Sequence, residues 1–140
     1  MKVIGTVFNG KNKEGDFEWQ IKSGTYEDSL FIFNEDESRA TWKKAGRGNA
    51  VIRKYNRYAV EKPRAVGVFT GTKEGGYTAL TDGVRLKIDG CIKEIRDTIK
   101  RYGYTTVYYS AKTRDGLLGT SIFQVDEKVL EYITQQLQSL

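Results

Sequence analysis

The chain of 140 residues contains no histidine, one cysteine, one proline and one methionine. The absence of histidine excludes Ser-His-Asp and Cys-His relays within the chain, and it excludes zinc sites built on imidazole. The single cysteine, Cys91, excludes an internal disulfide framework and is typical of a reducing cytoplasm. We therefore expect no metal and no cofactor, and any acid–base chemistry must fall to Asp, Glu, Lys or Tyr.

Long hydrophobic runs are also absent. No window approaches the roughly 20 apolar residues that a membrane-spanning helix needs, and residues 1–5 lack a signal-peptide pattern. The sequence therefore predicts a cytoplasmic protein with no membrane partner. Lys and Arg (23) outnumber Asp and Glu (18), and the net charge of +5 favours anionic partners. The length and an apolar content of 39% predict a single domain over residues 1–140.

The first third of the chain is predicted to be β-structure. Residues 3–8 and 17–21 flank a polar, glycine-containing stretch, and apolar residues alternate with polar ones in the second segment, which predicts an N-terminal β-hairpin. The continuous apolar run at residues 30–33 stops at Asn34 and is typical of a central strand covered on both faces. Residues 65–69 form another short strand candidate.

The second half is predicted to be α/β. Thr81 or Asp82 caps a long helix that Gly103 ends, and residues 104–109 form a strand that precedes a final helix near residues 126–137. This order implies a mixed sheet with parallel portions and flanking helices, an α/β fold whose ligands collect at the carboxyl ends of strands. The apolar stripe of the long helix consists of Val84, Ile88, Cys91, Ile92, Ile95 and Ile99.

Two glycine-rich loops are the most informative parts of the sequence. Residues 115–123 follow a predicted strand and precede a predicted helix, and residues 46–49 form a second Gly-rich turn far upstream. Such loops expose main-chain N–H groups without side-chain obstruction, which is what a phosphate group needs. Two of them suggest a ligand with more than one phosphate, such as a dinucleotide-like molecule.

Three segments in this order resemble a macro domain, the fold that binds ADP-ribose and its derivatives. Residues 24–34 resemble the family's early Gly-Asp-Ile segment and the buried strand that ends in asparagine. Residues 46–52 are similar to its first phosphate loop, and residues 119–123 to its second, usually Gly-Thr-Gly followed by an aliphatic and an aromatic residue. The resemblance spans residues 24–137 and implies a three-layer, macro-like fold, in which the N-terminal hairpin is either an addition or a divergent start.

The chain departs from the family pattern at three positions. Thr25 stands where the family usually has the aspartate that reads the adenine amino group, Arg47 interrupts the first glycine triplet, and Ser121 replaces the third glycine of the second loop. The whole chain also resembles small uncharacterised phage and bacterial proteins of macro-like type. That likeness implies an anti-defence role, in which the protein captures a nucleotide immune signal in the host cytoplasm.

The resemblance implies binding of an ADP-ribose-type nucleotide, whether ADP-ribose, a cyclic ADP-ribose or a related signal. Asn34 would hold the distal ribose and Phe123 would pack against a ribose. The alternative is a pair of flexible loops, with Asn34 in an Asx turn and Phe123 in the core. The ligand-binding candidates are Asn34, Gly46, Arg47, Gly48, Asn49, Gly119, Thr120, Ser121, Ile122 and Phe123.

Three other functions stay open from the residues alone. A hydrolase of ADP-ribose derivatives would position its substrate with Asn34 and with Asp36 or Asp115, although Asp115 beside Gly116 also suits a turn. A partner-binding protein would place its aromatic residues at an oligomer interface. A single-stranded nucleic-acid-binding module would use the basic residues of segment 42–58, for which a solvated helical face is the alternative. Those residues are Lys43, Lys44, Arg47, Arg53, Lys54 and Arg57, interleaved with Trp42, Tyr55 and Tyr58.

Overall fold

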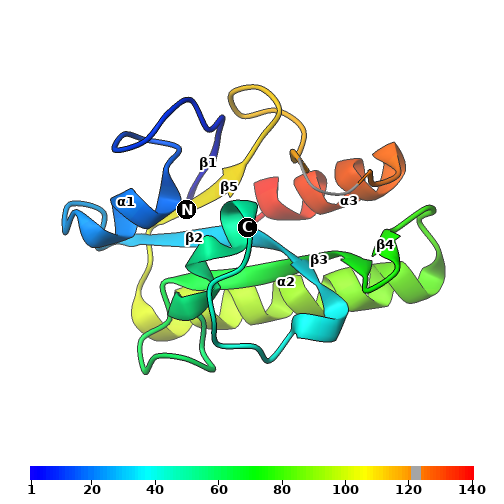
Figure 1. Ribbon diagram of the computed structural model, residues 1–140, viewed down its shortest axis with the longest axis horizontal. Helices are drawn as coiled ribbons and strands as arrows, with labels where there is room; N and C mark the ends of the chain where they lie inside the picture. The colour runs from blue at the N-terminus through cyan, green and yellow to red at the C-terminus, as the bar shows by residue number, and fades with distance from the viewer. Residues whose placement is uncertain (121–123) are drawn as a thin grey trace.

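The computed structural model describes residues 1–120 and 124–140, which build a five-stranded sheet in the order β1-β5-β2-β3-β4 (Figure 1). The first four strands in this order are parallel to one another, and only β4 is antiparallel to its neighbour. The sheet is therefore mixed, as the sequence predicted. The strands are β1 (Lys2–Thr6), β2 (Ser29–Asp36), β3 (Ala65–Thr72), β4 (Gly75–Gly76) and β5 (Thr106–Ser110).

The central strand β2 carries both hydrophobic cores. It pairs with β5 on one side and with β3 on the other. Leu30 and Ile32 face one core, whereas Phe31 and Phe33 face the other, and all four side chains are buried. The uninterrupted apolar run follows from this position because a strand covered on both faces has no solvent side for polar residues. The prediction of a central strand is confirmed.

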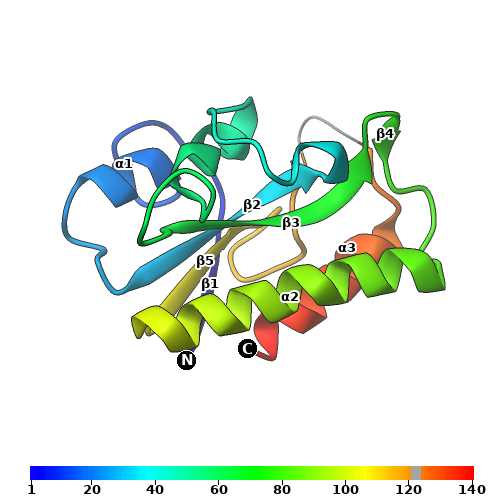
Figure 2. The same cartoon turned by 90° about the horizontal axis from the view of Figure 1, so that it is seen from below.

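Helices cover both faces of the sheet (Figure 2). The helices α2 (Asp82–Tyr102) and α3 (Glu127–Gln138) pack on the core that contains Leu30, while α1 (Phe17–Lys22) and the 3-10 helix η2 (Gly48–Tyr55) pack on the other. A short 3-10 turn, η1 (Glu37–Arg39), follows β2. In the part of the chain that the structure describes, no helix combines the length and the apolar composition needed to cross a bilayer.

The predicted limits of α2 are confirmed by its caps. The Thr81 side chain accepts a hydrogen bond from the N–H of Val84, and Gly103 ends the helix in the left-handed conformation with φ of 72°. Glycine suits that position because it has no Cβ to clash. Cys91 is a buried core residue of this helix, as expected, and burial raises the pKa of its thiol to about 12.

The prediction of an N-terminal β-hairpin is wrong. β1 pairs in parallel with β5, and the segment expected to return as a second strand is the helix α1. Asp16 caps that helix by accepting a hydrogen bond from the Trp19 N–H at 3.2 Å. Phe17 and Ile21 are buried four residues apart, so the short apolar pattern fits a helical period as well as a strand period. The cap decides between them because it pairs an N–H of the first turn that has no partner within the helix.

Candidate functional site

The candidate site lies where the parallel strands β1, β5 and β2 end. Parallel strands present their carboxyl ends at the same edge of a sheet, which is where ligands collect in α/β folds. Asn34, near the end of β2, lies at this edge, and Ser110 ends the neighbouring strand β5. Both glycine loops predicted from the sequence reach this edge.

Asn34 joins the two glycine loops. Its main-chain N–H donates to Oδ1 of Asn49 at 3.0 Å, and its side-chain Nδ2 donates to the carbonyl of Gly119 at 2.7 Å. Loops that are 70 residues apart in the sequence therefore meet at one side chain. The remaining atom, Oδ1 of Asn34, is buried and has no hydrogen-bond partner within residues 1–120 and 124–140. We call this meeting point, formed by Asn34, residues 46–49 and residues 119–120, the loop junction.

The first loop presents two main-chain donors at the junction. The N–H of Ala50 donates to the carbonyl of Arg47 at 3.1 Å and forms the first turn of η2. The N–H groups of Gly48 and Asn49 precede this turn, and no acceptor for them lies in the described parts of the chain. Gly48 has φ of 59°, a left-handed conformation that favours glycine. The N–H of Gly46, by contrast, already donates to the carbonyl of Ala50 at 2.9 Å.

A buried ion pair lies beneath the first loop. Arg53 is 2% exposed, and its Nε and Nη2 donate to the two carboxylate oxygens of Glu35 at 2.7 and 2.6 Å. Its Nη1 also donates to the carbonyl of Lys44 at 3.2 Å, which ties the loop to the pair. A Cβ on Gly46 would lie 2.8 Å from this Nη1, so the site needs glycine for close approach. The prediction that Arg53 belongs to an exposed basic surface is therefore wrong.

Main-chain and hydroxyl bonds hold the second loop. The N–H of Gly119 donates to the carbonyl of Ser110 at 3.0 Å, so it is not a free donor, and a Cβ at this position would lie 3.3 Å from the carbonyl carbon of Ala111. The N–H of Leu118 donates to Oγ1 of Thr134 on α3 at 2.9 Å. Thr120 is half-buried beside them. The other residues predicted for this loop, Ser121, Ile122 and Phe123, lie outside the described residues.

The two acidic candidates serve the local backbone. Oδ1 of Asp36 accepts from the N–H and the hydroxyl of Ser38, both at 2.8 Å, and so caps η1. Oδ1 of Asp115 accepts from the N–H of Gly5 at 2.9 Å, and the N–H of Asp115 donates in return to the carbonyl of Gly5. Asp115 also has φ of 56°, as the turn interpretation expects. Neither contact joins these carboxylates to the loop junction.

Positive charge borders the first loop. Lys43, Lys44 and Arg47 are exposed, and within the described residues none of them lies within 4 Å of a carboxylate. Trp42 is 49% exposed, and the guanidinium of Arg39 lies 4.7 Å from the centre of its ring. These cations raise the local concentration of anions near the junction. Among the described side chains, no group of three or more Cys, Asp or Glu residues is placed to hold a metal ion.

No protein-family model, curated protein or solved structure matches the chain. The case for a function therefore depends on the residues of the loop junction. Sequence reasoning missed the residues that hold the loops from behind: Glu35 and Thr134 carry no motif of their own. The one available signal for Glu35 was an acidic residue directly after Asn34 in a strand expected to be buried, since a buried carboxylate needs a cationic partner.

Proposed function

We propose that the protein binds an ADP-ribose-type nucleotide at the loop junction. The observation that carries the proposal is the pair of hydrogen bonds from Asn34, one to Asn49 and one to Gly119. This pair brings together two loops that each resemble a phosphate loop. A ligand with one phosphate has no need of two such loops, whereas a diphosphate can lie across both.

The free polar groups of the junction suit different parts of such a ligand. The N–H groups of Gly48 and Asn49 are donors for phosphate oxygens, and the nearby lysines and arginines add favourable charge. Oδ1 of Asn34 is an acceptor for a ligand hydroxyl, since a buried acceptor without a partner costs free energy that a bound hydroxyl recovers.

We favour binding over hydrolysis. Both acidic candidates, Asp36 and Asp115, use a carboxylate oxygen to hold the backbone of their own turns. A general base must reach the proton that it abstracts, and neither carboxylate contacts the junction. We therefore propose a sequestering role of the kind expected for a phage anti-defence protein, with ADP-ribose or a cyclic ADP-ribose as the captured molecule.

Calorimetry with ADP-ribose, cyclic ADP-ribose and NAD at modest salt tests the proposal. We expect heat with at least one ligand and at least a tenfold loss of affinity in Asn34→Asp, because the new carboxylate meets the Gly119 carbonyl and an anionic ligand. Gln135→Glu makes the same amide-to-carboxylate change at an exposed position of α3 and should bind as the unaltered chain does. No heat with any of the three ligands in folded protein would reject the proposal.

A time course with ADP-ribose-1''-phosphate separates a binder from a hydrolase. A binder leaves the phosphate ester intact when the protein is present in catalytic amounts relative to the ester. Release of phosphate that disappears in Asp115→Asn, with folding retained, would instead assign a hydrolase. Asp115→Asn keeps an oxygen that can accept from the Gly5 N–H, so it changes the charge more than the turn.

A second candidate, single-stranded nucleic acid binding, is favoured by how the loop before Gly46 is held. Arg53 and the buried Asn56 donate to the carbonyls of Lys44 and Trp42, at 3.2 and 2.9 Å, so this backbone is fixed from the inside. The side chains of Trp42 and its cationic neighbours are left exposed, which suits base stacking and phosphate contacts. Affinity for an oligonucleotide would then fall steeply with salt. The triple variant Lys43→Gln, Lys44→Gln, Arg47→Gln would flatten that dependence, and Asn34→Asp would not.

A further inference from the structure

The outer edge of β3 is open along most of its length. On this side β4 pairs only with Gly71 and Thr72. The N–H of Phe31 in β2 donates to the carbonyl of Arg64 at 2.9 Å. This bond shows which alternate residues of β3 direct their main-chain groups toward β2. Residues 64, 66 and 68 therefore bond to β2, and Gly67 and Phe69 direct their main-chain groups away from it.

The outward groups lack strong partners. The N–H of Phe69 has no hydrogen-bond partner in residues 1–120 and 124–140, and the side chain nearby in the groove, Cys91, offers only a weak acceptor. For the N–H and carbonyl of Gly67, no partner is present in the described parts of the chain. The edge thus offers hydrogen-bonding groups two residues apart along an extended backbone, which is the repeat that a further strand matches.

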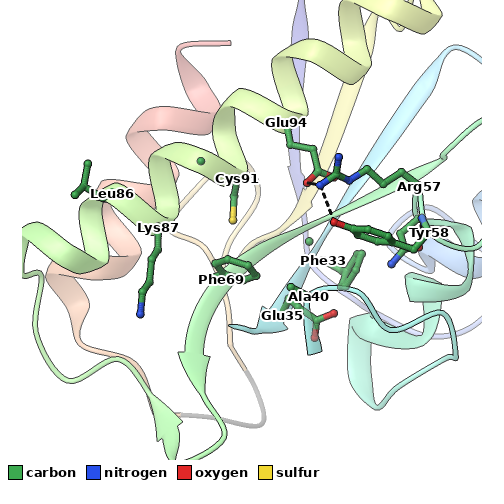
Figure 3. A pocket seen from close by; sticks show the side chains of 13 residues that line it. Phe33, Glu35, Ala40, Arg57, Tyr58, Phe69, Leu86, Lys87, Cys91 and Glu94 are labelled. Atoms are coloured by element: carbon green, nitrogen blue, oxygen red, sulfur yellow. Dashed lines mark hydrogen bonds and ion pairs between the residues drawn. The ribbon is translucent and has the colours of Figure 1, made fainter. Parts of the chain in front are cut away.

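A groove of about 260 Å³ runs along this edge (Figure 3). Gly67 and Phe69 line it from the sheet, α2 forms one wall with Gly90 and Cys91, and Tyr58 belongs to the opposite wall. Both walls rise beside the edge of β3. In a second copy of the chain, β3 is recessed between the same walls, so the two β3 edges cannot pair with each other. A single extended segment is narrow enough to enter the groove and pair with the edge.

Two residues of α2 that line the groove, Lys87 and Glu94, each form an ion pair with a residue outside the helix. Arg57 Nη2 lies 3.5 Å from Glu94 Oε1, and Lys87 Nζ lies 3.0 Å from Glu37 Oε1. Glu94 and Lys87 are two turns apart on α2, roughly 10 Å, which is the length of about three residues of a strand. The cation of each pair is about half exposed, at 53% for Arg57 and 49% for Lys87, and ion pairs that reach solvent are weak, so they open at little cost. Each pair carries both signs of charge, which favours an uncharged segment between them.

Gly90 is an unusual residue for the wall of the groove. Glycine is, after proline, the least favourable residue inside a helix, and Gly90 lies in the middle of α2. A Cβ added there would meet no atom within 4 Å, so packing within the chain gives no reason for glycine. Gly90 is exposed and lines the groove, so a larger residue at this position would narrow its opening.

We infer that this groove binds an extended, uncharged peptide segment of another protein, which adds to β3 as a strand. Its main chain pairs with the outward main-chain groups of Gly67 and Phe69. A small side chain of the segment faces Gly90. The site is separate from the loop junction, so the inference does not depend on the proposed nucleotide.

The first experiment selects peptides from a displayed library of short random sequences against the full chain. The selected peptide, made synthetically, should slow hydrogen exchange at Gly67 and Phe69 at least tenfold. N-methylation at one set of alternate residues should abolish binding, and at the other set it should have no effect, because only alternate residues of an added strand face β3. If no peptide is selected, or if protection falls outside residues 65–70, the inference is wrong.

A matched pair of variants completes the test. Gly90→Leu adds a side chain at a lining position where an added Cβ meets no atom within 4 Å, and it should weaken peptide binding more than tenfold. Lys93→Leu adds the same side chain to a position of the same helix that is 77% exposed, and it should bind as the unaltered chain does. Thermal unfolding shows whether both variants fold. Equal affinity of folded Gly90→Leu and the unaltered chain would overturn the inference.

Discussion

The two glycine loops meet at Asn34, but different chemistry holds each of them. The first loop lies on a buried ion pair, Arg53 with Glu35, whose guanidinium also holds the carbonyl of Lys44. The second loop is held by neutral bonds, from the Gly119 N–H to a strand carbonyl and from the Leu118 N–H to the hydroxyl of Thr134. The two loops therefore differ in how much free energy of unfolding is lost when a supporting side chain is removed.

The difference matters because the cost of losing a partner depends on charge. Removing one member of a buried ion pair leaves an uncompensated charge inside the protein, whereas removing a hydroxyl leaves one unpaired N–H. The first loop should therefore be the more sensitive to substitution beneath it.

Arg53→Met should destabilise the protein by about 3–5 kcal/mol because Glu35 is left buried without its cation. Urea unfolding measures the loss. Arg57→Met, four residues further along, removes an arginine whose side chain is 53% exposed and should cost no more than about 1 kcal/mol. Similar costs for the two variants would mean that burial of Arg53 does not govern the stability of the first loop.

Thr134→Val should cost about 1–3 kcal/mol because the buried N–H of Leu118 loses its acceptor. Thr98→Val is a close match: both threonines are 7% exposed on helices, and each hydroxyl donates to the carbonyl four residues earlier. Only Thr134 also accepts from a loop. Unfolding in urea should show a smaller cost for Thr98→Val, and equal costs would contradict a role for Thr134 in holding the second loop.

The sequence predicted the elements whose patterns are long or unambiguous. The stripe on α2, with Thr81 and Gly103 at its ends, is long enough to fit a helix only. The segment at Phe17 failed because five residues cannot separate a helical from an extended period, and the deciding contact is the Asp16 cap.

The site was predictable in outline because parallel strands bring the loops after them to one edge. The residues that hold the loops in place were not predictable from the sequence. Arg53 lies in a run of basic residues, and nothing local distinguishes it from its exposed neighbours. Its burial follows from Glu35, which comes from a distant strand, and a contact across 18 residues leaves no spacing that a periodic pattern would show.

Asn49→Ala should cost about 1 kcal/mol because the N–H of Asn34 loses its side-chain acceptor. The same variant should weaken nucleotide binding, since the first loop is released from β2. Asn9→Ala, at an exposed position, controls for the substitution itself and should leave urea unfolding unchanged. Loss of stability without any loss of nucleotide affinity would separate the bond from the proposed function.

Glu94 is the counterpart of Glu35, since it is half-buried and its arginine partner lies 3.5 Å away. We expect its effect on stability to be the smallest of those considered. Burial raises the pKa of Glu94 above its usual 4.5, and Arg57 offsets part of the rise. The folded state therefore holds this proton more tightly than the unfolded state does. The resulting stabilisation is complete below pH 4.5 and is lost as the pH rises through the folded pKa.

Relative to Glu94→Gln, the unaltered chain should therefore lose stability as the pH increases above 4.5, as urea unfolding across this range would measure. Arg57→Gln should make the loss steeper, because the raising effect of burial is then unopposed. A stability difference between the chain and Glu94→Gln that stays constant with pH would show that Glu94 is as well solvated as a surface carboxylate. In that case Glu94 would not be a partly paired counterpart of Glu35, and the comparison of buried carboxylates would hold for the first loop alone.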